Sequence, residues 1–299
     1  MALTSPDRAG GTFLRPLLST LRFIATHPVS SRRPLAGFWR YGRWQIESRL
    51  RPEVEFTWIE GSKLIVRNGM AGATGNIYCG LHEFSDMAFL LHLLRPDDLF
   101  IDVGANVGSY SVLASAVCGA CAIAVEPDPD TMRSLRRNIE ANGIGHRVAF
   151  VEAALGATPG TARFTVGLDT TNRIAPPGDA GTREVRVKTL DEIARGQHPV
   201  LVKLDVEGHE AMVLEGGRDT LRHPSLLAVQ VETAGEAVRD HLESAGFRRS
   251  VYAPFARKLS LLTDQGPAGS PNSLFVRDLD TCRRRVATAT ARNVLGRRI

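Results

Sequence analysis

The segment from Phe100 to Tyr110 constrains the fold of this chain more than any other part of the sequence. An apolar run passes there into the sequence DVGANVG (residues 102–108), and helix-forming residues follow. This order predicts a buried strand, a glycine turn and a helix, an arrangement that places a nucleoside ligand at the end of a strand. Gly104 permits a sharp turn and Gly108 permits the close approach of a ligand or strand, because glycine has no Cβ.

The identity of that ligand follows from the charges around the turn. A second apolar run, residues 121–125, ends in Glu126, and a carboxylate at the tip of a second strand accepts hydrogen bonds from ribose hydroxyls. The turn lacks the middle glycine of the dinucleotide pattern G-x-G-x-x-G, and Asp102 would repel a pyrophosphate. S-adenosylmethionine, with an ammonium and a sulfonium group, suits these acids better. The alternative is an α/β turn that binds no ligand.

Strand and helix patterns alternate along most of the chain. We expect seven strands, at residues 99–104, 121–126, 148–153, 200–205, 226–232, 247–252 and 273–277. The intervening helices are expected at residues 107–117, 128–142, 209–222 and 235–245. This alternation predicts an α/β fold with a mostly parallel sheet covered on both faces, and ligands then lie at the carboxyl ends of the strands. A short antiparallel pair is expected at 161–166 and 183–188, around the loop 176–179.

Acidic residues also end the fourth and fifth main strands. The fourth leads into DVEGHE (residues 205–210), and the fifth ends at Glu232. Helix capping explains one or two acids near a helix N-terminus. It does not explain acids at the ends of four separate strands, so we predict a functional site there.

These motifs resemble the FkbM family of S-adenosylmethionine-dependent methyltransferases. The resemblance covers roughly residues 80–235 and is carried by FIDVGANVG (100–108), VEP (125–127), Asn138, Asn142, EAALG (152–156) and, most specifically, KLDVEGHE (203–210). It implies the class I methyltransferase fold, a Rossmann-like seven-stranded sheet whose last two strands are antiparallel. It also implies methylation of hydroxyl groups, on sugars or polyketide-type metabolites.

The predicted cofactor site follows the strand ends. Its residues are Glu83, Asp102, Gly104, Ala105, Asn106, Gly108, Glu126, Pro127, Asp128, Glu152, Ala153 and Asp205. The glycine turn and Asp102 would hold the methionine end of the ligand, with Glu83 near its amino-acid group. Glu126 would bind the ribose, and Asp128 with residues 152–153 would lie along the adenine.

The catalytic prediction centres on His209. An alcohol must lose its proton as it attacks a methyl group, and a neutral imidazole is a suitable base near pH 7. Asp205, Glu207 and Glu232 would orient this base, accept the proton or hold a divalent ion. Carboxylates suit magnesium, but no spacing requires a metal, so no metal ligand is predicted. The alternative for His209 is a surface group in a turn.

The two ends of the chain are rich in arginine, within a formal net charge of +5. We expect a helical extension at residues 1–52, with helices at 13–26 and 35–50, a methyltransferase domain at 53–282 and a basic tail at 283–299. An aromatic and arginine-rich helix can dock on a membrane surface. It can also pack its aromatic residues on the catalytic domain, which we favour.

Several classes of protein and partner are disfavoured by the sequence. No apolar run reaches the length of about 18 residues needed to span a bilayer, and the start lacks a secretory signal, so a cytoplasmic location is expected. Cys118 and Cys121 have C-x-x-C spacing, but no second pair completes a zinc site. A nucleic-acid methyltransferase is disfavoured because clustered acids repel phosphates. A small-molecule or glycan acceptor is expected, and a non-catalytic docking module remains an alternative; the acceptor's identity and the oligomeric state do not follow from the sequence.

Overall fold

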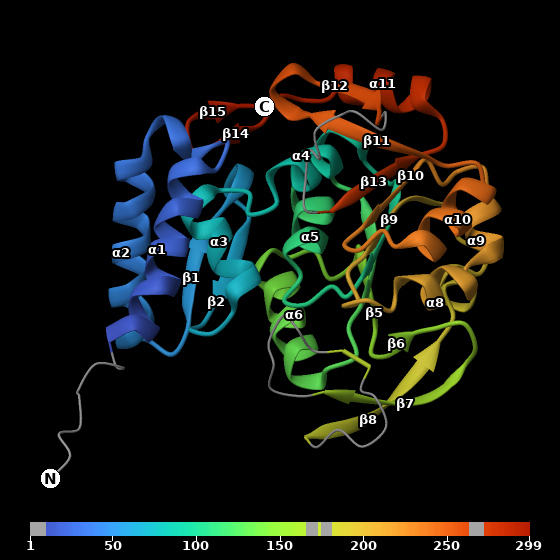
Figure 1. Ribbon diagram of the computed structural model, residues 1–299, viewed down its shortest axis with the longest axis horizontal. Helices are drawn as coiled ribbons and strands as arrows, with labels where there is room; N and C mark the ends of the chain where they lie inside the picture. The colour runs from blue at the N-terminus through green and yellow to red at the C-terminus, as the bar shows by residue number, and fades with distance from the viewer. Residues whose placement is uncertain (1–9, 166–172, 175–180, 263–271) are drawn as a thin grey trace, which may run out of the picture.

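One large β-sheet organises the described part of the chain, which in this computed structural model comprises residues 10–165, 173–174, 181–262 and 272–299 (Figure 1). Within those residues its eight strands lie in the order β12 (Lys258–Leu261), β11 (Arg248–Ala253), β13 (Ser273–Val276), β10 (Ala228–Val231), β9 (Pro199–Leu204), β3 (Leu99–Val103), β4 (Cys121–Val125) and β5 (Val148–Val151). The strands from β10 to β5 are parallel, whereas β13 is antiparallel to both β10 and β11. This order confirms the predicted class I methyltransferase sheet with its antiparallel last two strands.

One strand of this sheet was not predicted. In the described chain β12 extends the edge beside β11, so the sheet has eight strands rather than seven. It follows a 3-10 turn at Pro254–Ala256 and Arg257, whose φ is +49°. A four-residue strand that alternates Lys, Leu, Ser and Leu gives a weak sequence signal, because its strand character comes from pairing with a neighbour.

Helices cover both faces of the sheet because the strands are apolar on both sides. Phe100 and Leu201 belong to a buried cluster that also includes residues of α4 (Phe84–Leu93), α5 (Ser109–Val112), α6 (Pro129–Ala141) and α11 (Leu279–Ala287). Ile101 and Val202, the next residue along each strand, belong to a second cluster with α7 (Leu190–Ala194), α8 (Glu210–Glu215), α9 (Arg218–Arg222) and α10 (Glu236–Ser244). The helices therefore bury both faces of the sheet, and a binding site can form at the carboxyl ends of its parallel strands.

A layer of N-terminal elements lies beside the sheet (Figure 1). The two expected helices are present as α1 (Gly10–Thr26) and α2 (Pro34–Leu50). They are followed by the hairpin β1 (Val54–Thr57) and β2 (Lys63–Val66), and α2 packs on α3 (Ala71–Cys79). Ile24 and Trp44 are buried, and the Arg40 guanidinium donates to the carbonyl oxygen of Tyr78 at 3.0 and 2.7 Å. The extension is therefore packed against the rest of the chain.

Two local predictions were wrong because glycines serve close packing there rather than turns. The glycine-rich residues 69–76 predict a loop from their composition, but they lead into α3, where a Cβ on Gly75 would overlap the ring of His82. The single helix expected at 209–222 is divided into α8 and α9 at Gly216. A Cβ on Gly216 would overlap the carbonyl oxygen of Gly156, so only glycine fits at this break.

The remaining elements are a small sheet and the C-terminal elements α11, β14 and β15. The expected antiparallel pair is present as β7 (Gly160–Thr165) and β8 (Thr182–Lys188), and β6 (Ala154–Leu155) joins β8 in the same small sheet; the predicted loop 176–179 lies outside the described residues. The last residues form the end of α11 and the hairpin β14 (Asn293–Val294) and β15 (Arg297–Arg298), with Val286, Val294 and Ile299 buried. The proposed boundary at residue 282 falls inside α11, and the domain division stays a prediction. Among the described helices, none combines the length and the apolar character that a membrane span requires.

Candidate active site

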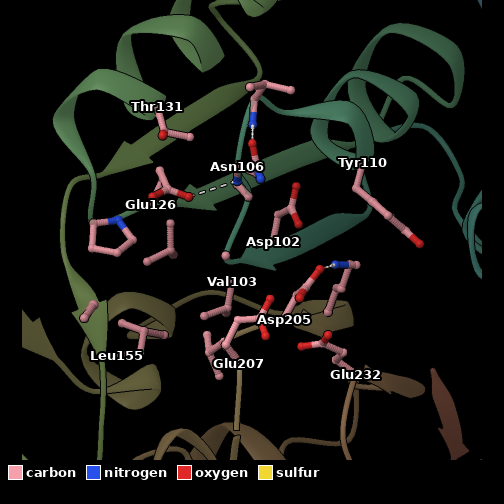
Figure 2. Close-up of a pocket in the computed structure, with 18 of the residues that line it drawn as sticks. Asp102, Val103, Asn106, Tyr110, Glu126, Thr131, Leu155, Asp205, Glu207 and Glu232 are labelled. Carbon is pink, nitrogen blue, oxygen red and sulfur yellow. Dashed lines mark hydrogen bonds and ion pairs between the residues drawn. The ribbon is translucent and has the colours of Figure 1, made fainter. Parts of the chain in front are cut away.

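A cavity of about 350 Å³ lies at the carboxyl ends of β3, β4, β9 and β10 (Figure 2). Three acidic residues, Glu126, Asp205 and Glu232, directly follow the strands β4, β9 and β10. The backbone N–H of each donates a hydrogen bond to the last carbonyl oxygen of the neighbouring strand, at 3.1, 3.0 and 3.0 Å. The sheet ladder therefore fixes the positions from which their side chains project. The volume lies in the range of about 300–1,000 Å³ that is typical of small-molecule sites.

The turn after β3 forms one wall of the cavity. Gly104 has φ +76°, and a Cβ there would overlap the carbonyl oxygen of Asp205. The N–H groups of Gly104 and Ala105 both donate to the carbonyl oxygen of Val125, at 3.0 and 2.9 Å. Glycine thus lets the tips of β3 and β9 approach each other, and hydrogen bonds join the turn to β4.

Glu126 is held rigidly on the opposite side of the turn. One carboxylate oxygen accepts a hydrogen bond from the backbone N–H of Asn106 at 3.0 Å (Figure 2), and the other accepts one from the backbone N–H of Asp128 at 2.9 Å. Burial raises the pKa of Glu126 to about 7, and the two N–H groups oppose this rise. Each carboxylate oxygen keeps a further lone pair for a ligand hydroxyl.

The floor of the cavity contains a buried lysine among acids. The Lys203 ammonium lies 2.5 Å from Asp205 Oδ2 and 4.6 Å from the centre of the Tyr110 ring. Burial alone would lower the pKa of Lys203, but Asp205, Glu83 and Asp102 outweigh it and raise the pKa. Asp102 accepts a hydrogen bond from Ser111 Oγ at 2.7 Å, and burial raises the pKa of Asp102 to about 6.

Three carboxylates meet at the end of the cavity formed by β9 and β10. One oxygen from each of Asp205, Glu207 and Glu232 lies within 4.8 Å of the others, a spacing that a divalent cation could bridge. Burial, and then the charge of Asp205, raise the pKa of Glu232 to about 8, whereas Lys203 keeps the pKa of Asp205 below its usual value despite burial. Glu207 has φ +52°, a backbone conformation that is uncommon for glutamate.

His209 also lines the cavity, at the start of α8. Its Nε2 lies 3.6 Å from the position that a Cβ on Gly156 would take. Burial lowers the pKa of His209, so the imidazole is uncharged at neutral pH. A neutral imidazole beside acidic groups can accept a proton from a bound hydroxyl.

The structure brings most of the predicted residues to one cavity. Those that line it are Glu83, Asp102, Gly104, Ala105, Asn106, Glu126, Pro127, Ala153, Asp205, Glu207, His209 and Glu232.

Three predicted residues lie elsewhere. Gly108 precedes α5 with φ +88° and packs on Leu135. Asp128 caps α6, where its carboxylate accepts hydrogen bonds from the backbone N–H groups of Asp130 and Thr131. Glu152 is exposed. Their predicted contact with the cofactor therefore has no support in the cavity lining.

The sequence prediction omitted several residues that line the cavity. Lys203 and Tyr110 form its polar floor, where the Tyr110 hydroxyl donates to Glu83 Oε2 at 2.8 Å. The pairing of Lys203 with Asp205 had a usable signal, because residues two apart on a strand share a face. His82 also lines the cavity, and its ring lies 5.1 Å from that of Phe23 in α1, which sequence spacing could not reveal.

Comparison with known proteins agrees with this geometry. Residues 102–249 match the family described as Methyltransferase FkbM domain. The chain is 30% identical over 146 residues to hexuronic acid methyltransferase AglP of Haloferax volcanii, covering 48% of this chain and 59% of that protein. It is 35% identical over 112 residues to 31-O-demethyl-FK506 methyltransferase FkbM of Streptomyces tacrolimicus, covering 36% of this chain and 42% of that protein. The alignments thus span about half of the length of these relatives.

The solved structures that resemble this chain are more distant in sequence. Precorrin-6Y C5,15-methyltransferase of Geobacter metallireducens is 14% identical, with a TM-score of 0.38 over 66% of this chain and 88% of that one. The fold assignment therefore rests on the strand order of this chain. The strand order and the acidic cavity at the strand ends agree with the family match, which places residues 102–249 of this chain among the FkbM methyltransferases.

Proposed function

We propose that this protein transfers a methyl group from S-adenosylmethionine to a hydroxyl group of a sugar or other small molecule. One observation carries the proposal: among the described residues, six carboxyl groups and one ammonium line a cavity at the strand ends of the FkbM domain. The carboxyl groups belong to Glu83, Asp102, Glu126, Asp205, Glu207 and Glu232. A ligand that carries a sulfonium and an ammonium group is attracted to such an environment.

The residues present fit this cofactor by their chemistry and position. Glu126 would accept hydrogen bonds from the ribose hydroxyls, as its fixed carboxylate retains free lone pairs. The apolar residues Pro127, Ala153 and Leu155, which line the same cavity, would contact the adenine. The turn at Gly104 and the acids around Lys203 would hold the methionine portion, with the Lys203 ammonium available to its carboxylate.

Methyl transfer requires alignment and loss of the acceptor's proton. When bound, S-adenosylmethionine supplies an electrophilic methyl group on sulfur. The neutral imidazole of His209 would accept the proton from the hydroxyl of the acceptor. Glu232, whose raised pKa keeps it largely protonated at pH 7, would donate a hydrogen bond near the same point, and Asp205 remains ionised.

The proposed acceptor class follows from the chemistry of the site and from the names of the relatives. Two of the relatives are named as a hexuronic acid methyltransferase and a 31-O-demethyl-FK506 methyltransferase. Both names describe a small molecule or sugar. The acidic lining repels phosphates, which disfavours a nucleic-acid acceptor.

The proposal is tested with methyl-labelled S-adenosylmethionine and a panel of hexuronic acids, neutral sugars and polyketide alcohols. We expect label in an alkali-stable ether on one class of acceptor. His209→Ala should lower turnover about 10²- to 10⁴-fold while S-adenosylhomocysteine still binds, as measured by calorimetry. Label that appears only on RNA or protein would contradict the acceptor class, and loss of cofactor binding in His209→Ala would contradict the role as base.

A chelator added to the same assay tests the carboxylates Asp205, Glu207 and Glu232 as a cation site. Hard oxygen ligands suit magnesium, so activity abolished by the chelator and restored by Mg²⁺ would indicate a required ion. Activity that is unchanged would leave these carboxylates with the orienting roles given above.

A further inference from the structure

The outer face of α2 carries a stripe of exposed apolar side chains. Leu35, Trp39, Ile46 and Leu50 are 79%, 63%, 62% and 77% exposed. At 3.6 residues per turn these four positions fall within about 60° of one another around the helix axis. We call these four residues the α2 stripe.

The stripe lies opposite the face by which α2 packs. Gly37 and Trp44 are buried, and their positions lie about 150–170° around the helix from the centre of the stripe. A Cβ on Gly37 would overlap the Ile24 side chain, so this face fits closely on α1. The stripe therefore contributes nothing to the core, although it holds four of the eight most exposed large apolar residues in the described chain.

Positive charge surrounds the stripe. Arg43 and Arg49 are exposed and lie on either side of it, about 20° and 40° beyond its edges, and Arg51 follows the end of the helix. Arg43 pairs with Glu47 at 2.8 Å, the one acid in this region. Residues 16–52 contain seven arginines and one glutamate, a net charge of +6. Figure 1 shows α2 at the side of the molecule, away from the large sheet.

We propose that the α2 stripe docks this protein on the surface of an anionic lipid bilayer. Aliphatic and Trp side chains would enter the boundary between headgroups and acyl chains, while the flanking arginines contact anionic headgroups. A symmetric contact between two copies through the stripe would bring the arginines that flank one stripe close to those that flank the other, with one acid, Glu47, in each copy to offset them. Nucleic acid would use the arginines but not Leu35, Ile46 or Leu50.

The test is co-sedimentation of the full chain with vesicles of equal parts phosphatidylcholine and phosphatidylglycerol. We expect binding to these vesicles and much weaker binding to phosphatidylcholine alone. Changing the four residues of the stripe to Gln, which favours helix, should abolish binding. The double variant Arg43→Gln with Arg49→Gln should bind about 30-fold more weakly, at about fivefold per arginine.

Matched controls lie on other helices. Met212→Gln removes an exposed apolar residue of α8, and Arg133→Gln with Arg218→Gln removes two exposed arginines; all of these should bind as wild type. Circular dichroism verifies that each variant is folded. Equal vesicle binding by the wild type and the stripe variant would overturn the proposal. So would a wild-type dimer, seen by sedimentation, that the stripe variant dissociates without any binding of vesicles.

Discussion

The substitution Glu126→Gln isolates the role of the carboxylate at the tip of β4. It keeps the shape of the side chain but removes the charge that would accept hydrogen bonds from the ribose. A hydrogen bond to a charged group contributes about 1.5–3 kcal/mol, so we expect S-adenosylhomocysteine to bind about 10- to 150-fold more weakly. Isothermal titration calorimetry at about pH 8, where Glu126 is ionised, measures this difference.

Two opposing effects should leave this variant folded. A pKa raised from 4.5 to about 7 corresponds to about 3 kcal/mol that disfavours the folded state at pH above 7, and the neutral amide removes it. The amide has one acceptor oxygen, so the N–H of Asn106 or of Asp128 loses its hydrogen-bond acceptor. This loss lowers the free energy of unfolding by about 1–3 kcal/mol. The net change in the free energy of unfolding is therefore small, and thermal denaturation verifies it.

The pH dependence and a matched control sharpen the test. Because the carboxylate form of Glu126 increases as the pH rises through about 7, wild-type affinity should rise over that interval and the affinity of Glu126→Gln should change less. Glu152→Gln alters an exposed acid beyond the next strand, outside the cavity, and should bind as wild type. Wild-type affinity in Glu126→Gln, or an equal loss in Glu152→Gln, would refute the assignment.

Two further substitutions test the framework of the site. Gly104→Ala should lower the free energy of unfolding by at least about 1–3 kcal/mol, because φ is +76° and the new Cβ meets the carbonyl oxygen of Asp205. Urea denaturation measures this change, and Gly145→Ala, which has open space around the new Cβ, is the control. A Gly104→Ala variant as stable as the control would show that the contact relaxes freely. Lys203→Met should lower the free energy of unfolding by about 3 kcal/mol, because it leaves Asp205 without its buried partner, and an unchanged urea midpoint would argue against this ion pair.

The arrangement of the sheet and most of the cavity could be predicted because apolar runs mark buried strands. An acidic residue directly after such a run lies at the carboxyl end of a strand, as found for Glu126, Asp205 and Glu232. Side-chain direction beyond the strand end was harder to predict, since a change of one residue reverses the face. Glu152 is therefore exposed while Ala153 is buried in the cavity wall.

Other differences from the sequence prediction arise from helix capping and from close packing. Asp128 precedes Pro129, a pair typical of a helix start, and its carboxylate caps α6. In the sequence, Gly75 and Gly216 cannot be distinguished from glycines that form turns. In the structure, the absence of a Cβ lets His82 pack on Gly75 and the carbonyl oxygen of Gly156 pack on Gly216. Distinguishing these two uses of glycine requires the neighbouring element, which lies far away in the sequence.

The contact between Phe23 and His82 has a consequence for any shortened version of the protein. His82 is part of the cavity wall and also part of the surface that α1 covers, so deletion of the first 52 residues would expose one side of that wall to water. The same deletion would uncover Cys79, which now accepts or donates a hydrogen bond with Ser30 at 3.4 Å. A chain trimmed to residues 102–249, which match the family, would lack both Phe23 and His82, so its cavity wall would differ and ligand affinities should be measured on the 299-residue chain.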